Sequence, residues 1–111
     1  MDASDERLPA ERLSPEDLPR LALFLARYLG WEGAATHGSA AAAAHDYAAE
    51  AELDELDELA HEWEILRAAA RTLSLAELNR TLATRFGGPW QAVSVDELDA
   101  VAAELERALR E

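Results

Sequence analysis

The apolar residues of this chain recur at steps of three and four, which is the spacing of one face of an α-helix. The clearest stripe lies in the middle of the chain and consists of Leu56, Leu59, Trp63, Leu66, Ala70 and Leu73. A second apolar run predicts a helix from Pro19 to Leu29, ended by Gly30. Because Leu23 and Phe24 widen its apolar face, we expect this helix to be the central one.

Short polar signals mark where further helices begin and end. Ser74-Leu75-Ala76-Glu77 and Ser94-Val95-Asp96-Glu97 both have the capping-box pattern, in which a serine is followed three residues later by a glutamate. The first box predicts a helix over 74–86, ended by Gly87, and the second predicts a helix at the end of the chain. A glycine-containing loop is expected over 31–39, with Ser39 as the cap of the next helix.

Residues 40–73 contain neither glycine nor proline, and their pattern remains helical throughout. One uninterrupted helix of this length would be about 50 Å long. Two alternatives therefore stay open: the helix breaks near residues 50–53, or its alanine-rich first half projects and packs on another chain.

The composition agrees with a helical fold. The chain has 111 residues, half of them hydrophobic, but isoleucine occurs once and valine three times, so there is little material for strands. We predict an all-α fold, a small bundle of four to five helices of which one is long and strongly acidic. Residues 1–13 are expected to form a flexible N-terminal arm and residues 14–111 a single helical domain.

The formal net charge is −13, and it is unevenly distributed. Residues 28–66 hold ten acids and no arginine, whereas residues 67–86 hold four arginines and one acid. Such a balance argues against general binding to nucleic acid backbones or anionic membranes. The absence of cysteine excludes disulfides and thiolate chemistry. The polar N-terminus and the short apolar runs give no sign of a signal peptide or membrane span, so a cytoplasmic location is expected.

These features favour a non-enzymatic protein-binding module, such as a neutraliser, an inhibitor or an assembly factor. Its acidic helix face would dock a basic protein partner, since dense carboxylates on a rigid helix steer cationic proteins. We also expect a homodimer or other homo-oligomer, and no cofactor. The residues predicted to bind the partner are Asp54, Asp57, Glu58, Glu62 and Trp90.

Two alternatives from other functional classes remain. Glu58 and His61 lie three apart, so on a helix they could supply ligands to a di-iron-like metal centre if an oligomer provided a second set. The residue pattern of 74–86 resembles that of the first helix in a helix-turn-helix regulator. In that reading Arg80 and Arg85 would lie near nucleic acid. Asp96 and Glu97, at the start of the following helix, argue against DNA binding because they would face phosphates and base edges.

Overall fold

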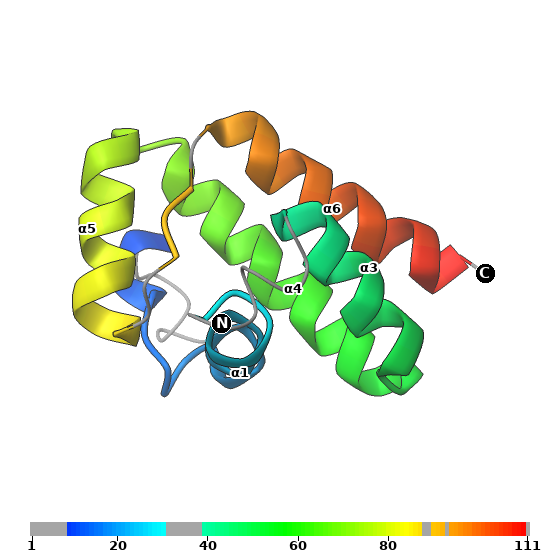
Figure 1. Ribbon diagram of the computed structural model, residues 1–111. Helices are drawn as coiled ribbons and strands as arrows, with labels where there is room; N and C mark the ends of the chain where they lie inside the picture. The colour runs from blue at the N-terminus through cyan, green and yellow to red at the C-terminus, as the bar shows by residue number, and fades with distance from the viewer. Residues whose placement is uncertain (1–8, 31–38, 88–89, 93, 111) are drawn as a thin grey trace, which may run out of the picture.

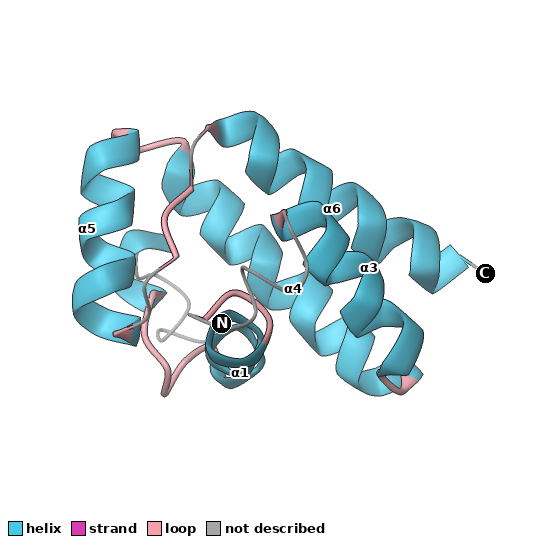
Figure 2. Ribbon diagram, in the orientation of Figure 1, coloured by secondary structure: helices cyan, strands magenta, loops and turns pink. Residues whose placement is uncertain are grey.

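The computed structural model describes residues 9–30, 39–87, 90–92 and 94–110, and all regular structure within them is helical (Figures 1 and 2). The elements are the 3₁₀ helix η2 and five α-helices: η2 (Pro9–Arg12), α1 (Pro19–Arg27), α3 (Ala40–Glu50), α4 (Leu53–Ala70), α5 (Leu75–Phe86) and α6 (Val95–Arg110). The prediction of a small all-α bundle is confirmed. Apart from Ser39, the loop expected over 31–39 lies outside the described residues. Of the helices described, none has the length and apolarity needed to cross a bilayer.

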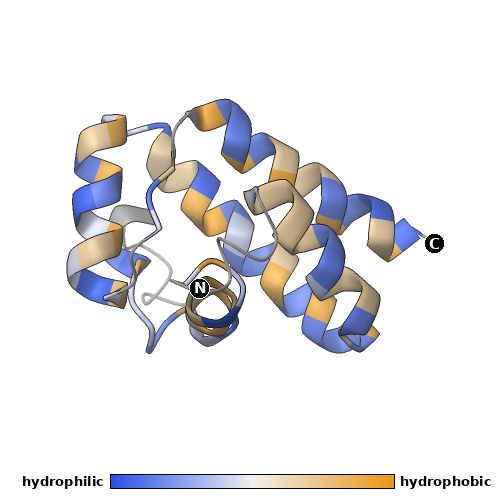
Figure 3. Ribbon diagram, viewed as in Figure 1, coloured by the Kyte–Doolittle hydropathy of each residue, from blue (hydrophilic) through white to orange (hydrophobic). Residues whose placement is uncertain are grey.

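Helix α4 lies at the centre of the bundle. It contacts η2, α1, α5 and α6, while α3 packs against α6 (Figure 1). The sequence predicted α1 as the central helix, and that is wrong. Helix α1 has only nine residues, whereas α4 has eighteen and can reach all of its neighbours. Hydrophobic and hydrophilic residues alternate around the helices, as expected when each buries one face (Figure 3).

The core is built around the apolar stripe of α4. Trp63, Leu59 and Leu66 are fully buried, and Phe24 of α1 meets the ring of Trp63 edge-on with their centroids 5.9 Å apart. The indole Nε1 of Trp63 donates a hydrogen bond to the carbonyl oxygen of Leu98 at 2.9 Å. Burial of this large side chain therefore leaves its one polar group satisfied and connects α4 to α6.

The N-terminal segment joins the helical body earlier than expected. The sequence assigned residues 9–13 to a flexible arm, but η2 packs against α4 and Leu13 is completely buried. Residues 1–8 of the expected arm lie outside the described part. A single leucine with no periodic neighbours gives a weak sequence signal, although its burial adds apolar contact to the core.

The predicted caps are present where the structure describes them. Ser39 Oγ accepts from Ala42 N, and the Ser74–Glu77 capping box is closed in both directions. Its hydrogen bond from the Ser74 backbone lowers the pKa of Glu77. Gly87 ends α5 with a φ of 73°, in the left-handed region where glycine is favoured. At the start of α6, Ser94 Oγ accepts from Glu97 N at 3.3 Å.

The helix expected over 40–73 is divided in two. Ala51 and Glu52 are extended, with ψ values of 149° and 160°, so the chain turns between α3 and α4. Glu52 N donates to Glu55 Oε1 at 3.0 Å, which satisfies a donor at the start of α4. Of the two alternatives, the structure has the break near residues 50–53.

Asn79 fixes the connector between α5 and α6. Its Nδ2 donates to the Ala92 carbonyl oxygen at 2.9 Å, and its Oδ1 accepts from Ala92 N at 2.8 Å. The side-chain amide thus pairs with both polar groups of one backbone residue, as a neighbouring strand would. This contact holds Ala92 in the core, where it is buried.

Candidate functional site

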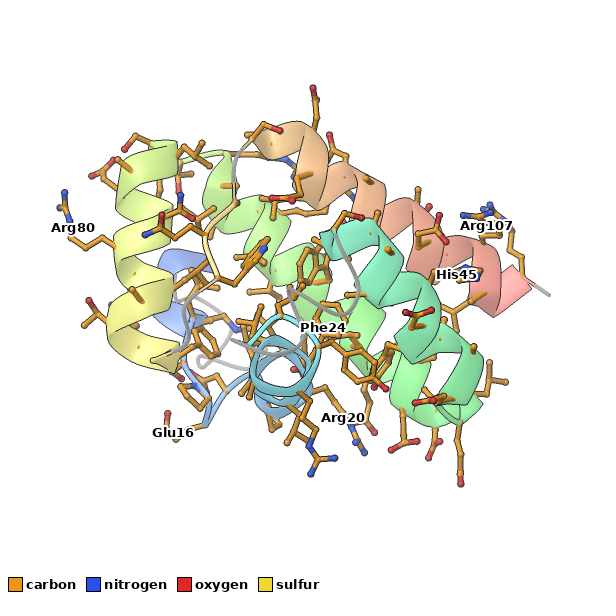
Figure 4. All side chains as sticks on the ribbon, in the orientation of Figure 1. Glu16, Arg20, Phe24, His45, Arg80 and Arg107 are labelled. Carbon is orange, nitrogen blue, oxygen red and sulfur yellow. The ribbon has the colours of Figure 1, made fainter. Side chains whose placement is uncertain are left out.

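The turn between α3 and α4 brings together a cluster of exposed carboxylates. We call it the acidic surface, and it consists of Glu50, Glu52, Asp54, Asp57 and Glu58. Residues three and four apart on a helix are neighbours, so Asp54, Asp57 and Glu58 share one side of α4. Figure 4 shows carboxylates extending outward at the end of the molecule where α3 meets α4. Three of the five predicted partner-binding residues therefore lie side by side.

Arg20 of α1 neutralises part of this surface. Its Nε lies 3.1 Å from Glu58 Oε2, and its Nη1 lies 3.1 Å from Glu55 Oε2. The hydrogen bond to Glu58 is the main cause of a raised pKa for the Arg20 guanidinium. Asp57 and Asp54, by contrast, form no ion pair with any other residue in the described part of the chain. Their charge is therefore directed to solvent.

The structure removes Glu62 from the acidic surface. This residue was expected on the polar side of its helix, yet it is only 8% exposed. Its Oε1 accepts a hydrogen bond from Leu21 N at 2.8 Å, in the first turn of α1. Burial raises the pKa of Glu62, and the backbone hydrogen bonds partly offset that effect. Glu62 is thus an N-terminal cap for α1 supplied by another helix.

Trp90 also lies away from the acidic surface. It is half-buried, and its ring centroid is 6.3 Å from that of Trp63. Trp63 belongs to the buried stripe of α4, on a different side from Asp54 and Asp57. Trp90 therefore covers the core at this position and is not grouped with the predicted carboxylates.

The predicted metal ligands are not assembled into a metal-binding group. Glu58 is engaged by Arg20, and His61 is exposed one turn further along α4. Among the residues that the structure describes, no group of three or more histidine, aspartate or glutamate side chains could hold an ion. Among the described residues of one copy of the chain, Glu58 and His61 thus lack the further ligands that a di-iron-like centre needs.

The arginine-rich segment folds as the predicted helix over 74–86. Arg80 extends outward from α5 into solvent (Figure 4). Arg85 Nη1 donates to the carbonyl oxygen of Leu13 at 3.3 Å, so this arginine contacts the N-terminal segment. Helix α6, which would follow as the reading helix, buries Leu98, Val101, Ala102 and Leu105 and begins with Asp96 and Glu97.

A groove that was not predicted from the sequence lies beside the acidic surface. It lies between α1 and the junction of α3 with α4, and Leu23, Arg27, Tyr28, Tyr47 and Glu50 contribute to its lining. Tyr28 Oη donates to Glu50 Oε2 at 2.9 Å. Burial, followed by this hydrogen bond, raises the pKa of Tyr28, and burial likewise raises that of Tyr47. Both hydroxyls therefore remain protonated at neutral pH.

The signal that could have revealed the groove is weak. Tyr28 and Tyr47 are nineteen positions apart, and each can be read as the end of an ordinary apolar stripe. Their rings meet edge-on with centroids 5.4 Å apart, a contact that arises only when α3 lies beside the end of α1.

Comparisons with protein-family models, with curated proteins and with solved structures found no match to this chain.

Proposed function

We propose that this chain is a non-enzymatic protein-binding module whose acidic surface docks a basic protein partner. The observation that carries the proposal is the exposure of Asp54 and Asp57 without an ion pair to any other described residue. Carboxylates in this state attract an arginine- or lysine-rich surface over a distance of roughly a Debye length, about 8 Å at physiological salt. Their place on one rigid helix keeps the pattern of charge fixed before binding.

The ion pairs of Arg20 support the same assignment. Arg20 holds Glu55 and Glu58 in place, so the carboxylates beside Asp57 are positioned before any partner arrives. Side chains that are already ordered lose less conformational freedom on binding. Glu62 has no place in this surface and acts within the fold.

A matched pair of charge reversals tests the proposal. Asp57→Arg changes the acidic surface, and Glu106→Arg makes the same change of net charge at an exposed position on α6. The probe is a fluorescent nona-arginine peptide, titrated at 50 mM and at 300 mM salt. We expect Asp57→Arg to weaken binding about 3- to 10-fold at low salt, as loss of a surface ion pair and gain of repulsion imply. Glu106→Arg should weaken it by less than about twofold.

Two results would contradict the proposal. Equal effects of the two reversals would mean that the peptide responds only to net charge. Binding that is indifferent to salt would mean that the carboxylates do not carry it. If neither result occurs, co-purification from the native host, repeated with Asp57→Arg, would identify the natural partner.

The finer parts of the proposal have tests of their own. Homo-oligomerisation would appear in light scattering as a mass above the 12.1 kDa of one chain. A cytoplasmic location would appear in fractionation of host cells. Absence of catalysis stays a prediction based on the sequence.

A further inference from the structure

The groove between α1 and the α3–α4 junction is small and open. Its volume is about 230 Å³. Pockets for drug-sized ligands commonly have volumes of about 300–1,000 Å³. The groove is therefore suited to one side chain of a larger partner.

Leu23, Tyr28 and Tyr47 give the groove an apolar and rigid part, and charged side chains line much of the rest. Leu23 is 44% exposed, which makes it one of the three large hydrophobic side chains found exposed in the described part of the chain. Tyr28 stacks on Phe24 with ring centroids 5.7 Å apart, and Tyr47 meets Phe24 edge-on at 5.6 Å. Since Phe24 is fully buried, the two tyrosines are held by the core. Tyrosine and arginine are also the residue types enriched where binding energy concentrates.

Two glutamates and two arginines also line the groove, and the acidic surface lies beside it. Glu50 lies in the groove wall and also belongs to the acidic surface. Arg20, which lines the same wall, is already paired with Glu55 and Glu58. Arg27 has no ion pair with another described residue, so its guanidinium is available to a backbone carbonyl or a carboxylate of the partner.

We infer that this groove receives one leucine-sized apolar side chain from a basic amphipathic helix of the partner. On such a helix, the residues three and four positions from the anchor share its apolar face, and basic residues flank that face. With the anchor in the groove, its basic neighbours would lie over Glu50 and the rest of the acidic surface. This inference rests on the proposed function and specifies the partner as a helix laid into a groove, rather than a flexible polybasic tail.

One substitution separates an apolar anchor from simple charge attraction. Leu23→Glu removes the apolar wall and adds a negative charge. Attraction alone predicts that a basic peptide binds this variant as tightly as the wild type, or more tightly. Insertion of an anchor predicts weaker binding by about tenfold, since most of the benefit of burying an aliphatic side chain is lost. Val95→Glu makes the same change at an exposed residue of α6 and should change the affinity by less than about twofold.

The experiment uses two synthetic peptides made of the same leucines, alanines and arginines. In one peptide the residue order gives an amphipathic helix, and in the other the order is scrambled so that no apolar face forms. We expect the full-length protein to bind the amphipathic peptide more tightly and Leu23→Glu to remove that preference. Leu23→Ala, which adds no charge, should reduce the preference as well, and circular dichroism would check the fold of each variant.

Each outcome distinguishes the inference from the proposed function. If both peptides bind equally and Asp57→Arg weakens both, the acidic surface docks basic partners but the groove holds no anchor. If Leu23→Glu binds the amphipathic peptide at least as tightly as the wild type, the inference is likewise overturned. If neither peptide binds at 50 mM salt, both the inference and the proposed function fail.

Discussion

Glu62 of α4 caps the first turn of α1, because its Oε1 accepts a hydrogen bond from the backbone nitrogen of Leu21 at 2.8 Å. The residue before the helix, Leu18, has no side chain able to do this, and Pro19 has no N–H to satisfy. The start of α1 therefore depends on a carboxylate that is 41 positions away in the chain.

Removal of the carboxylate should destabilise the fold. Glu62→Ala leaves Leu21 N buried without its acceptor, and we expect a loss of about 1–3 kcal/mol in the free energy of unfolding. Glu62→Gln keeps an oxygen acceptor and should cost less. Urea denaturation of both variants at pH 7 measures the difference. Equal losses would show that the negative charge, and not the hydrogen-bond acceptor, stabilises α1.

The same residue should make stability depend on pH. Because burial raises the pKa of Glu62 above that of the unfolded chain, the folded state binds its proton more tightly. The resulting stabilisation is fully present below the unfolded pKa of about 4.3 and is lost as pH rises through the folded value. The stability of the wild type relative to Glu62→Gln should therefore decrease from acid toward neutral pH. A relative stability that increases over this range would mean that folding lowers the pKa of Glu62.

The contact between Asn79 and Ala92 should contribute as much to the free energy of unfolding as a helix cap does. Asn79→Ala leaves both polar groups of the Ala92 backbone without their partner, and we expect a loss of about 1–3 kcal/mol. Thr81→Ala is the control on the same helix, since the Thr81 hydroxyl donates to the Glu77 carbonyl oxygen one turn earlier, within α5 itself. Thermal unfolding should distinguish them, and similar losses would mean that the connector is not held by the amide.

Two glycines should respond differently to the addition of a methyl group. The Cβ that Gly87→Ala adds has no atom within 4 Å. The loss in the free energy of unfolding, about 1 kcal/mol, therefore comes from the left-handed backbone alone, and Gly87→Asn should lose less. At Gly30 the new Cβ would collide with the carbonyl oxygen of Ala26, so the backbone after α1 must move. We expect the larger loss at Gly30. A smaller loss there would show that this turn adjusts easily.

The helices were predictable because their signals are local. The stripe containing Trp63, the caps Ser39 and Ser74, and the stop at Gly87 all act over one or two helical turns, and the structure confirms each of them. The break at Ala51 was left open, since neither alternative violates the local pattern. The overall length of 36 Å leaves no room for an unbroken helix of about 50 Å.

The candidate site was predictable only in part. Asp54, Asp57 and Glu58 lie together because their spacing alone places them on one side of a helix. Glu62 fits the same spacing loosely, but its burial depends on where α1 packs. The groove forms where three segments meet. These are α1 and the residue after it, with Leu23 and Tyr28, then α3 with Tyr47, and the turn at Ala51. No local sequence pattern predicts that these three segments pack together.

The central position of α4 has a consequence for synthesis of the chain. Its apolar stripe is covered from one side by η2 and α1, which precede it, and from the other side by α6, which follows. A ribosome therefore completes the stripe before it translates α6, which supplies the hydrogen-bond acceptor of Trp63. Until Leu98 emerges, the indole N–H of Trp63 lacks its native acceptor on α6, so the core around this tryptophan can close fully only when the last helix has been translated.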